Sequence, residues 1–307
     1  MTVTAMNRSL LGIASLCLGS FVFSLQDAII KSVSGEYAVT LALSIRCLVA
    51  FPILLAMVRY EAGLSRLMSR HISTFVLRGI LLLVAYTSYF MALAAMPMAE
   101  AIALYFTVPI IVTLLSWPLL GEPVGLRSWL AVGAGFIGIV IILQPGSAVF
   151  EPAALLSLVS ATTYALSMLI ARRIGSSEPA SVMAYYQNAV YLLFAVLAAA
   201  SFHQIGVERL GHPSLDFLVR PWTFPDANDA LLMGACGVIA AVGAWLLTNA
   251  YRLAPASLVS IFEYSGVIWV PLWGFLFFSE IPRLTTAIGM LVIIGAGLYA
   301  ARIARRS

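Results

Sequence analysis

The sequence contains little charge. Only 10% of its 307 residues are Asp, Glu, Lys or Arg, whereas 62% are hydrophobic. A soluble domain carries roughly 25% charged residues. A water-soluble fold could not bury this much apolar surface, so we expect the chain to be solvated by a lipid bilayer. The formal net charge of +4 does not indicate a nucleic-acid partner, because the basic residues fall at the ends of apolar segments and form no patch.

Cysteine, histidine and nucleotide-binding motifs are also scarce. The three cysteines all lie inside apolar runs, which argues against a disulfide framework and against a zinc site. The three histidines fall in predicted loops, and no His-Glu-x-x-His pattern occurs. No glycine-rich phosphate loop ends in Lys-Ser or Lys-Thr, which argues against direct use of ATP. We therefore expect no metal and no cofactor.

Long apolar segments are abundant. A helix needs about 20 apolar residues to cross the hydrocarbon core. The segments that qualify are 9–31, 38–58, 73–93, 99–119, 127–144, 152–172, 180–200, 229–250, 257–278 and 284–303. No small-x-small cleavage site follows the first segment, so it is interpreted as a retained helix. The sequence thus predicts an all-α integral membrane bundle of ten transmembrane helices.

The basic residues predict the topology, because Lys and Arg accumulate on the cytoplasmic side. With the N-terminus inside, the cytoplasmic ends collect Arg8, Arg59, Arg66, Arg70, Arg127, Arg172, Arg173, Arg252, Arg302, Arg305 and Arg306. The opposite ends collect Lys31, Arg209, Arg220 and Arg283. We therefore expect a multi-pass protein of a bacterial-type inner (plasma) membrane with both termini cytoplasmic and the loop 201–228 periplasmic. The pattern makes no prediction of an oligomeric state.

The chain repeats itself. At an offset of 158 residues the matched pairs are Gly79 with Gly237, Ala92 with Ala250, Pro97 with Pro255 and Glu122 with Glu280. Residues 1–147 and 148–307 are therefore predicted to form two five-helix repeats. Because five is odd, the second repeat must be inverted relative to the first. Inverted repeats are typical of alternating-access carriers, whose solute site lies near the membrane midplane where the repeats meet.

The order of short motifs resembles a known family. The motifs are Asp27-Ala28-Ile29-Ile30-Lys31, Arg46, and the run from Ala92 through Pro97 to Glu122, which the run from Ala250 to Glu280 repeats. Together they resemble the drug/metabolite transporter superfamily, in its ten-helix branch built from two EamA-type repeats. The resemblance implies a gradient-linked carrier of metabolites, often of amino acids and often outward. Aromatic residues in the presumed cavity helices are similar to those of aromatic amino acid exporters, and other members carry S-adenosylmethionine.

Glu263 is the sharpest candidate for a functional residue. It lies about six residues into the segment 257–278, and ionisable groups at such depth are costly and usually face the bundle interior. It would hold a substrate ammonium group or carry a coupling proton. The alternative is a buried partner for an arginine or a backbone group. Tyr105 is its repeat-mate at an offset of 158 and is a cavity candidate by symmetry, although it could equally be a packing or lipid-facing residue.

Two arginines lie within predicted helices. Arg46 is roughly 12 Å deep at 1.5 Å per residue, at a depth similar to that of Asp27. A structural Asp27–Arg46 ion pair is one interpretation, and capture of a substrate carboxylate by Arg46 is the other. Asn188 occupies the mirrored position and carries no charge. Arg78 is close enough to a helix end to extend to the surface, so it is assigned no role.

An aromatic stripe is a further candidate for a binding wall. Tyr86, Tyr89 and Phe90 share one helix face at spacings of three and four residues. Trp245 and Asn249 share a face of the mirrored helix, where Asn249 offers both a donor and an acceptor to an amino-acid head group. Such a stripe could also serve packing alone. Gly237 and Gly243 favour close approach of this mirrored helix to its neighbours.

Prolines and matched glutamates predict local structure. Pro109, Pro118 and Pro271 are expected to kink the segments 99–119 and 257–278. Glu122 and Glu280 stand in matched turns and are expected to cap the helices that follow them.

The predicted function is secondary transport of small organic metabolites by alternating access, with export of aromatic or hydrophobic amino acids favoured. The alternative within transport is an importer or exchanger of another metabolite, such as S-adenosylmethionine or a nucleoside derivative. A membrane enzyme acting on lipid substrates would need a polar cluster at one interface, which the sequence lacks. A non-transporting receptor or scaffold is a third class. The expected partners are a small-molecule substrate and the lipid bilayer.

Overall fold

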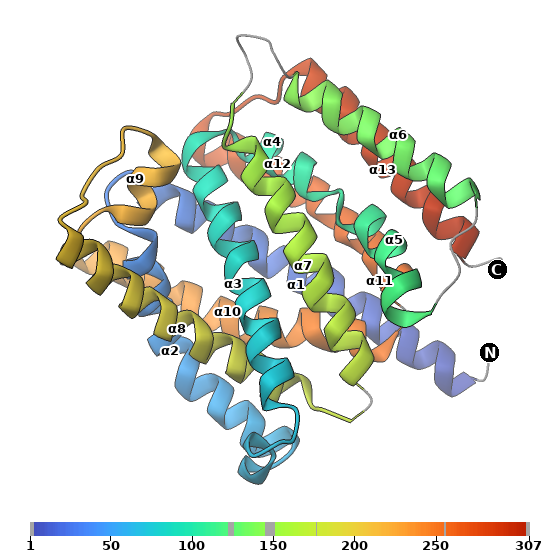
Figure 1. The fold of residues 1–307 in the computed structure, drawn as a ribbon, viewed down its shortest axis with the longest axis horizontal. Helices are drawn as coiled ribbons and strands as arrows, with labels where there is room; N and C mark the ends of the chain where they lie inside the picture. Colours follow the sequence, from blue (N-terminus) through green and yellow to red (C-terminus); the bar gives the residue numbers. More distant parts are fainter. Residues whose placement is uncertain (1–2, 122–125, 145–150, 176, 255, 305–307) are drawn as a thin grey trace.

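In the computed structural model, the described residues are 3–121, 126–144, 151–175, 177–254 and 256–304, and these contain helices and no strand (Figure 1). The helices of the first half are α1 (Val3–Val33), α2 (Val39–Glu61), η1 (Leu64–Leu67), α3 (Ile72–Ala95), α4 (Met98–Tyr105), α5 (Val108–Leu120) and α6 (Leu126–Leu143). Those of the second half are α7 (Ala154–Ile174), α8 (Ala180–Ile205), α9 (Pro213–Val219), α10 (Ala227–Leu253), α11 (Ala256–Val259), η2 (Ser260–Ser265), α12 (Gly266–Phe278) and α13 (Leu284–Ala304).

Six of these helices are long and apolar enough to cross a bilayer. They are α1, α2, α3, α7, α8 and α10, each with at least 21 residues within its apolar span. Shorter apolar helices cover 98–112, 133–143, 262–278 and 284–296. A helix satisfies its own backbone hydrogen bonds, which is what allows these segments to lie in hydrocarbon. The chain is therefore a multi-pass membrane protein.

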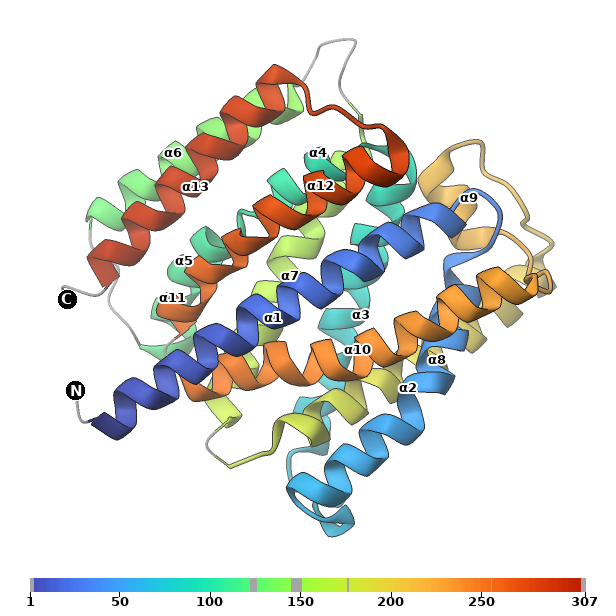
Figure 2. The same cartoon turned by 180° about the vertical axis from the view of Figure 1, so that it is seen from behind.

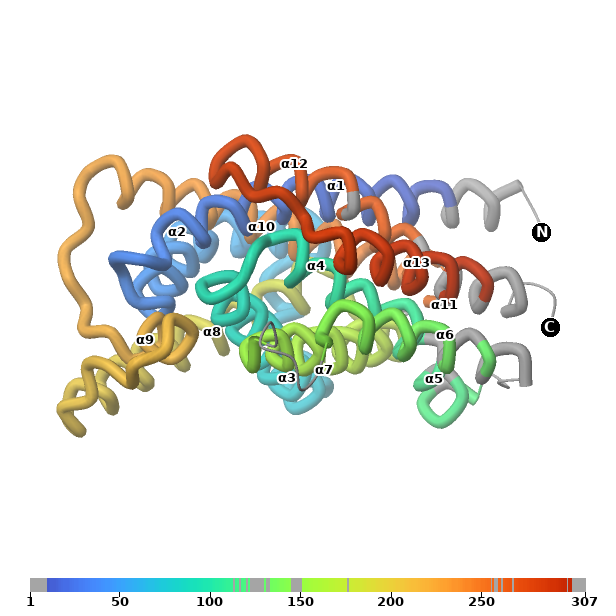
Figure 3. Tube along the Cα trace, turned by 90° about the horizontal axis from the view of Figure 1, so that it is seen from above, coloured from blue at the N-terminus to red at the C-terminus, as the bar shows by residue number. Residues whose placement is uncertain are grey.

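The helices pack as long antiparallel and crossed pairs. The main pairs are α1 with α10, α3 with α7, α2 with α8, and α6 with α13. In Figure 2, α1 lies between α10 and α12, while α6 and α13 form a separate pair along one edge. The start of α1 and the end of α13 lie at the same end of the bundle, and α9 lies at the other end (Figure 3). This arrangement leaves α1, α3, α7 and α10 around the centre.

Two of the predicted spans are broken near their middle. The predicted segment 99–119 is divided, because α4 ends at Tyr105 and α5 begins at Val108. Pro109 is the second residue of α5, and its ring is incompatible with a helical carbonyl four residues earlier, at Tyr105. The predicted segment 257–278 is divided into α11, the 3₁₀-helix η2 and α12. The expectation of continuous, kinked helices is therefore corrected to two discontinuous ones.

The other two prolines that were predicted to kink a helix lie inside helices. Pro118 is inside α5 and Pro271 is inside α12, so neither stands at a break. The second break is instead a 3₁₀ segment, a tighter helix that is used in short pieces and often at functional hinges. Tyr105 ends α4 and Glu263 lies in η2, so the two residues matched at an offset of 158 occupy the two breaks.

Glu280 does not act as predicted. Its Oε2 accepts a hydrogen bond from the backbone N–H of Met98 at 2.8 Å, and its Oε1 pairs with the Lys31 Nζ at 2.7 Å. Met98 is the first residue of α4, so Glu280 satisfies an N-terminal amide of α4 rather than of the helix that follows it. Glu122, its predicted counterpart, lies outside the described residues.

Glycines allow α10 to approach its neighbours closely, as expected. A Cβ atom at Gly237 would lie 2.6 Å from the carbonyl oxygen of Arg46 on α2. A Cβ atom at Gly243 would lie 2.6 Å from the ring of Phe23 on α1. These contacts are shorter than carbon–carbon packing distances of about 3.5–4.0 Å. Glycine at both positions therefore sets how deeply α10 packs against α1 and α2.

Candidate functional site

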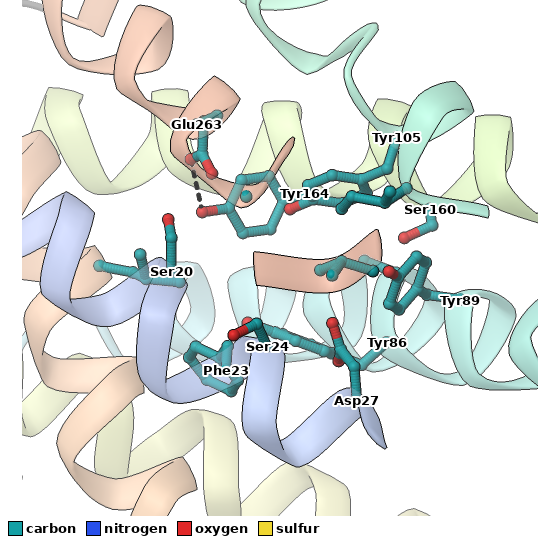
Figure 4. Close-up of a pocket in the computed structure, with 15 residues that line it drawn as sticks. Ser20, Phe23, Ser24, Asp27, Tyr86, Tyr89, Tyr105, Ser160, Tyr164 and Glu263 are labelled. Carbon is teal, nitrogen blue, oxygen red and sulfur yellow. Dashed lines mark hydrogen bonds between the residues drawn. The ribbon is translucent and has the colours of Figure 1, made fainter. Parts of the chain in front are cut away.

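A cavity of about 60 Å³ lies among the central helices. It is lined by Ser20, Phe23, Ser24, Asp27, Ala85, Tyr86, Tyr89, Ile102, Tyr105, Ser160, Tyr164, Leu247, Glu263, Gly266 and Val270. Figure 4 shows these side chains around the space. An apolar cavity that accepts benzene measures about 150 Å³. The present cavity accommodates a few water molecules, and a solute of amino-acid size fits only when the helices separate.

Glu263 lies in this cavity without a cationic partner. Its Oε1 accepts hydrogen bonds from the hydroxyl groups of Tyr164, at 2.9 Å, and Tyr251, at 3.1 Å. Its exposed fraction is 6%. Among the described residues, no Lys, Arg or His nitrogen lies within 4.0 Å of it. Two neutral donors orient the carboxyl group and leave its charge, or its proton, available to a ligand.

Tyrosines form the wall beside Glu263. The ring centroids of Tyr89 and Tyr105 are 5.5 Å apart, and those of Tyr105 and Tyr164 are also 5.5 Å apart. Phe23 on α1 lies 5.5 Å from Tyr86 on α3. These separations are typical of interacting aromatic pairs. The predicted stripe residues Tyr86 and Tyr89, and the symmetry-derived Tyr105, therefore share one cavity with Glu263, where their faces can contact an aromatic ring or a cation.

Asp27 provides a second carboxyl group. It lies on α1 with an exposed fraction of 7%, across the pocket from Glu263 and beside Tyr86 and Tyr89 (Figure 4). Its electrostatic neighbours are Tyr89 and Arg46. The predicted direct Asp27–Arg46 ion pair is absent from the five pairs formed within 4.0 Å by described residues. The two charges therefore interact only at longer range.

Arg46 is held by aromatic rings instead. Its guanidinium carbon lies 5.3 Å from the ring centroid of Tyr191 and 5.8 Å from that of Tyr86. Both distances are within the range of cation–π contacts. Arg46 is only 1% exposed and does not line the cavity, whereas Tyr86, which it contacts, does. Asn188, at the mirrored position, donates a hydrogen bond to the Cys47 carbonyl at 3.0 Å.

Three further predicted site residues, besides Arg46, do not line the cavity. Phe90 is fully buried and packs 6.0 Å from the ring of Tyr86. The Trp245 Nε1–H donates to Glu61 Oε2 at 3.0 Å. The Asn249 Oδ1 accepts a hydrogen bond from Arg252 at 3.2 Å. Trp245 and Asn249 therefore belong to a polar cluster where α10 meets the end of α2.

The sequence interpretation missed the contribution of α7. Its cavity residues are Ser160 and Tyr164, and its buried polar positions are Ser157, Ser160, Tyr164 and Ser167. These positions are three to four residues apart and therefore lie along one helix face. A polar stripe on an otherwise apolar helix would have identified Tyr164 from the sequence. Ser20 and Ser24 on α1 were missed for the same reason.

Arg78 does not extend to the surface as expected. Its exposed fraction is 1%, and its Nη2 donates a hydrogen bond to Thr248 Oγ1 on α10 at 2.8 Å. The side chain is held inside the bundle, where α3 packs against α7 and α8 and Thr248 of α10 accepts its hydrogen bond. The prediction of an exposed guanidinium is therefore wrong.

Comparisons with known proteins agree with this architecture. Residues 10–144 match the model of the EamA-like transporter family. The riboflavin transporter of Vibrio cholerae is 30% identical over 222 residues, 71% of this chain and 68% of that protein. The pseudopaline exporter CntI of Pseudomonas aeruginosa is 27% identical over 92% of this chain and 93% of its own length. The S-adenosylmethionine uptake transporter of Rickettsia bellii is 24% identical over 93% of each chain.

The fold is also known from experiment. A solved structure titled "Crystal structure of protein" superimposes with a TM-score of 0.66 at 20% identity and covers 98% of each chain. A multi-pass helical bundle with a central polar cavity and transporter relatives defines a membrane transporter. The chain belongs to the EamA-like transporter family, within the drug/metabolite transporter superfamily. The three relatives are named for different solutes, one of them for export and one for uptake, and none is named an exporter of aromatic amino acids.

Proposed function

We propose that the protein is a secondary carrier of small amphiphilic metabolites, with export of aromatic or hydrophobic amino acids favoured. The main support is Glu263, a buried carboxyl group that faces a tyrosine-lined cavity and receives only neutral donors. An ammonium group is the natural ligand for such a carboxyl, and an aromatic side chain stacks on tyrosine rings. Glu263 is also the candidate for a coupling proton.

Alternating access is supported by reciprocal packing of the two halves, residues 1–147 and 148–307. The contact of α1 with α10 has its counterpart in the contact of α7 with α3. Likewise, α4 and α5 pack on α7, while α12 and η2 pack on α1. Reciprocal contacts of this kind are what a pseudo-twofold axis between two inverted five-helix repeats produces. In this scheme each discontinuous helix counts as one of ten spans.

Both ends of the cavity are held by ion pairs between the halves. At the end where α1 finishes, Lys31 pairs with Glu280, and Glu100 with Arg283. Where α2 finishes, Glu61 pairs with Arg252 at 3.4 Å. In the proposed cycle, one set breaks while the other persists, so the cavity opens to one side at a time. The small volume of the cavity is consistent with an occluded state.

The orientation follows the distribution of basic residues. Helix α1 begins and α13 ends at one end of the bundle in Figure 1, and the basic residues of the sequence predict that these helix ends are cytoplasmic. We place this end in the cytoplasm of a bacterial-type inner membrane and α9 in the periplasm.

The test is flux of labelled phenylalanine, tryptophan, threonine and S-adenosylmethionine in liposomes containing the purified protein, with and without a pH gradient. We expect saturable flux of the aromatic amino acids. Glu263→Gln should reduce it about tenfold or more and remove its dependence on the pH gradient, because a charged hydrogen bond is lost. Glu36→Gln, a change at an exposed loop carboxyl, is the matched control. Unchanged flux in Glu263→Gln would overturn the assignment.

A second candidate is uptake or exchange of S-adenosylmethionine. One relative is named for this activity over 93% of both chains. Two buried carboxyl groups and a tyrosine wall also suit a sulfonium cation, through charge and cation–π contacts. Counterflow with labelled S-adenosylmethionine separates this candidate from amino acid export. Saturable solute flux of either kind would exclude a receptor or scaffold, and product formation in detergent would instead indicate a membrane enzyme.

A further inference from the structure

Arg78 is a buried cation without an acidic partner among the described residues. It is 1% exposed, and none of the ion pairs formed by described residues includes it. Its Nη2 donates to Thr248 Oγ1 at 2.8 Å, whereas its Nε and Nη1 have no hydrogen-bond partner. Its electrostatic neighbours are three hydroxyl groups, those of Tyr164, Tyr191 and Tyr86. An isolated charge with unpaired donors is costly inside a membrane protein and usually marks function.

A second guanidinium group approaches the same tyrosines from α2. Arg46 contacts the rings of Tyr191 and Tyr86, and its Nε and Nη1 also lack hydrogen-bond partners. The buried hydroxyl of Tyr191 likewise has no partner. Arg46 has Asp27 within electrostatic reach, whereas the electrostatic neighbours of Arg78 are tyrosine hydroxyls. The region around Tyr191 therefore contains an excess of donors and of positive charge.

This region adjoins the cavity. Tyr86 and Tyr164 line the cavity on one side and interact electrostatically with Arg78 on the other. Leu247, the residue before the Arg78 partner Thr248, also lines the cavity. Arg78 lies in the second turn of α3, nearer to the start of that helix than the cavity residues Tyr86 and Tyr89. Along α3, Arg78 therefore lies between the cavity residues and the end where the helix begins.

The ligand that matches this chemistry is an oxyanion. Unpaired N–H groups of arginine bind carboxylate, sulfonate or phosphate oxygens in a planar fork, and a hydroxyl can donate one more bond. We propose that Arg78, with Arg46 and Tyr191, forms an anion-binding subsite for the carboxylate, sulfonate or phosphate group of the transported solute. This inference rests on the proposed carrier function and adds the substrate class, a solute with its cationic group at Glu263 and its anionic group at Arg78.

The first experiment tests the anion subsite without a transport assay. Purified protein in detergent is titrated with sodium acetate, methanesulfonate or phosphate, each replacing chloride at constant ionic strength, while the unfolding temperature is recorded. We expect saturable stabilisation by at least one anion. Arg78→Gln should raise the apparent Kd for that anion about tenfold or more, because a charged hydrogen bond is lost. Arg78→Lys retains the charge and should retain part of the effect. Arg173→Gln, at an exposed arginine of α7, should behave as wild type.

A second titration tests the substrate class. Phenylalanine and phenethylamine differ only in the carboxylate, so Arg78→Gln should weaken binding of phenylalanine while binding of phenethylamine changes less than about twofold. A flat anion response of the wild type, or an equal response in the monodisperse Arg78→Gln protein, would overturn the inference even if amino acids are transported. Saturable anion binding without any amino acid flux would support the anion subsite and contradict the proposal that amino acids are the substrates.

Discussion

The hydroxyl of Tyr164 on α7 donates a 2.9 Å hydrogen bond to the carboxyl group of Glu263 in the break between α11 and α12. Tyr164 also lies 5.5 Å from the ring of Tyr105, which ends α4 in the other half. One side chain therefore contacts both discontinuous helices. Because the site is assembled around it, movement of either break changes the surroundings of Glu263.

Removal of this hydroxyl tests the relationship. Tyr164→Phe retains the ring and its packing but leaves Glu263 with Tyr251 as its donor. We expect solute flux to fall about three- to tenfold, which corresponds to one lost hydrogen bond to a charged group. Flux in liposomes provides the measurement, with Tyr60→Phe as control because that side chain is 88% exposed. Equal flux in both variants would contradict a role for the hydroxyl.

The end pairs should control access to the cavity. Arg283→Gln removes the partner of Glu100, and Glu61→Gln removes the partner of Arg252 at the opposite end. If each substitution reduces the free energy of closure at its own end of the cavity by about 1 kcal/mol, the fraction of protein open at that end rises about fivefold. A Ser20→Cys label in the cavity, in a background without the native cysteines, reports this as faster reaction with membrane-impermeant thiol reagents.

The two variants serve as controls for each other. Arg283→Gln should accelerate labelling from the side where α1 ends, and Glu61→Gln from the side where α2 ends. Acceleration from the same side in both proteins would contradict the assignment of the pairs to opposite gates.

The segment 206–219, which contains α9, should lose local stability in acid. Asp216 Oδ1 accepts backbone hydrogen bonds from Leu210, at 2.6 Å, and Gly211, at 3.1 Å, and these bonds lower the pKa of Asp216 below its ordinary value. The folded loop thus binds fewer protons than the unfolded loop. Its contribution to stability is present above about pH 4 and is lost as pH falls through the lowered pKa. The protection factors of the amides over 206–219, corrected for the intrinsic pH dependence of exchange, should fall in that range. Asp216→Asn should show low protection factors already at pH 7, and protection equal to that of the wild type there would refute this explanation.

Gly237 should resist substitution. A Cβ atom there would lie 2.6 Å from the Arg46 carbonyl oxygen, a backbone atom that cannot rotate away. We expect Gly237→Ala to destabilise the protein by about 1–3 kcal/mol, as overpacking does. In α6, a Cβ atom at Gly133 would meet nothing within 4 Å, so Gly133→Ala should be neutral or slightly stabilising. Thermal unfolding in detergent compares the two variants, and equal unfolding temperatures would refute the packing argument.

The sequence predicted the helical class and the approximate span limits, because apolar length is set by membrane thickness. Hydropathy did not reveal the two breaks. The runs 99–119 and 257–278 remain apolar throughout, and a 3₁₀ turn such as η2 changes backbone geometry without changing composition. A helix end that depends on tertiary packing therefore leaves no signal in the hydropathy pattern.

The site was accessible to sequence reasoning where two independent signals coincided. Glu263 stood out as a charge in an apolar segment, and the repeat offset then pointed to Tyr105; both line the cavity. Trp245 and Asn249 were predicted only from their spacing of four residues. Such spacing shows that two residues share a helix face but does not show which neighbour that face contacts. The packing of α10 against α1 and α2 sets the direction of that face, and it turns both residues toward Glu61 and Arg252.

The breaks in the two halves match in position but not in chemistry. Under the proposed inverted repeat, Tyr105 at the end of α4 and Glu263 in η2 occupy equivalent places, so a solute in the cavity would meet a phenol from one half and a carboxyl group from the other. For a carrier of the proposed kind, the inward and outward half-reactions then have unequal barriers. The concentration gradients still decide the equilibrium. The apparent affinities at the two membrane faces will therefore differ, and the ratio of the maximal rates must compensate for that difference.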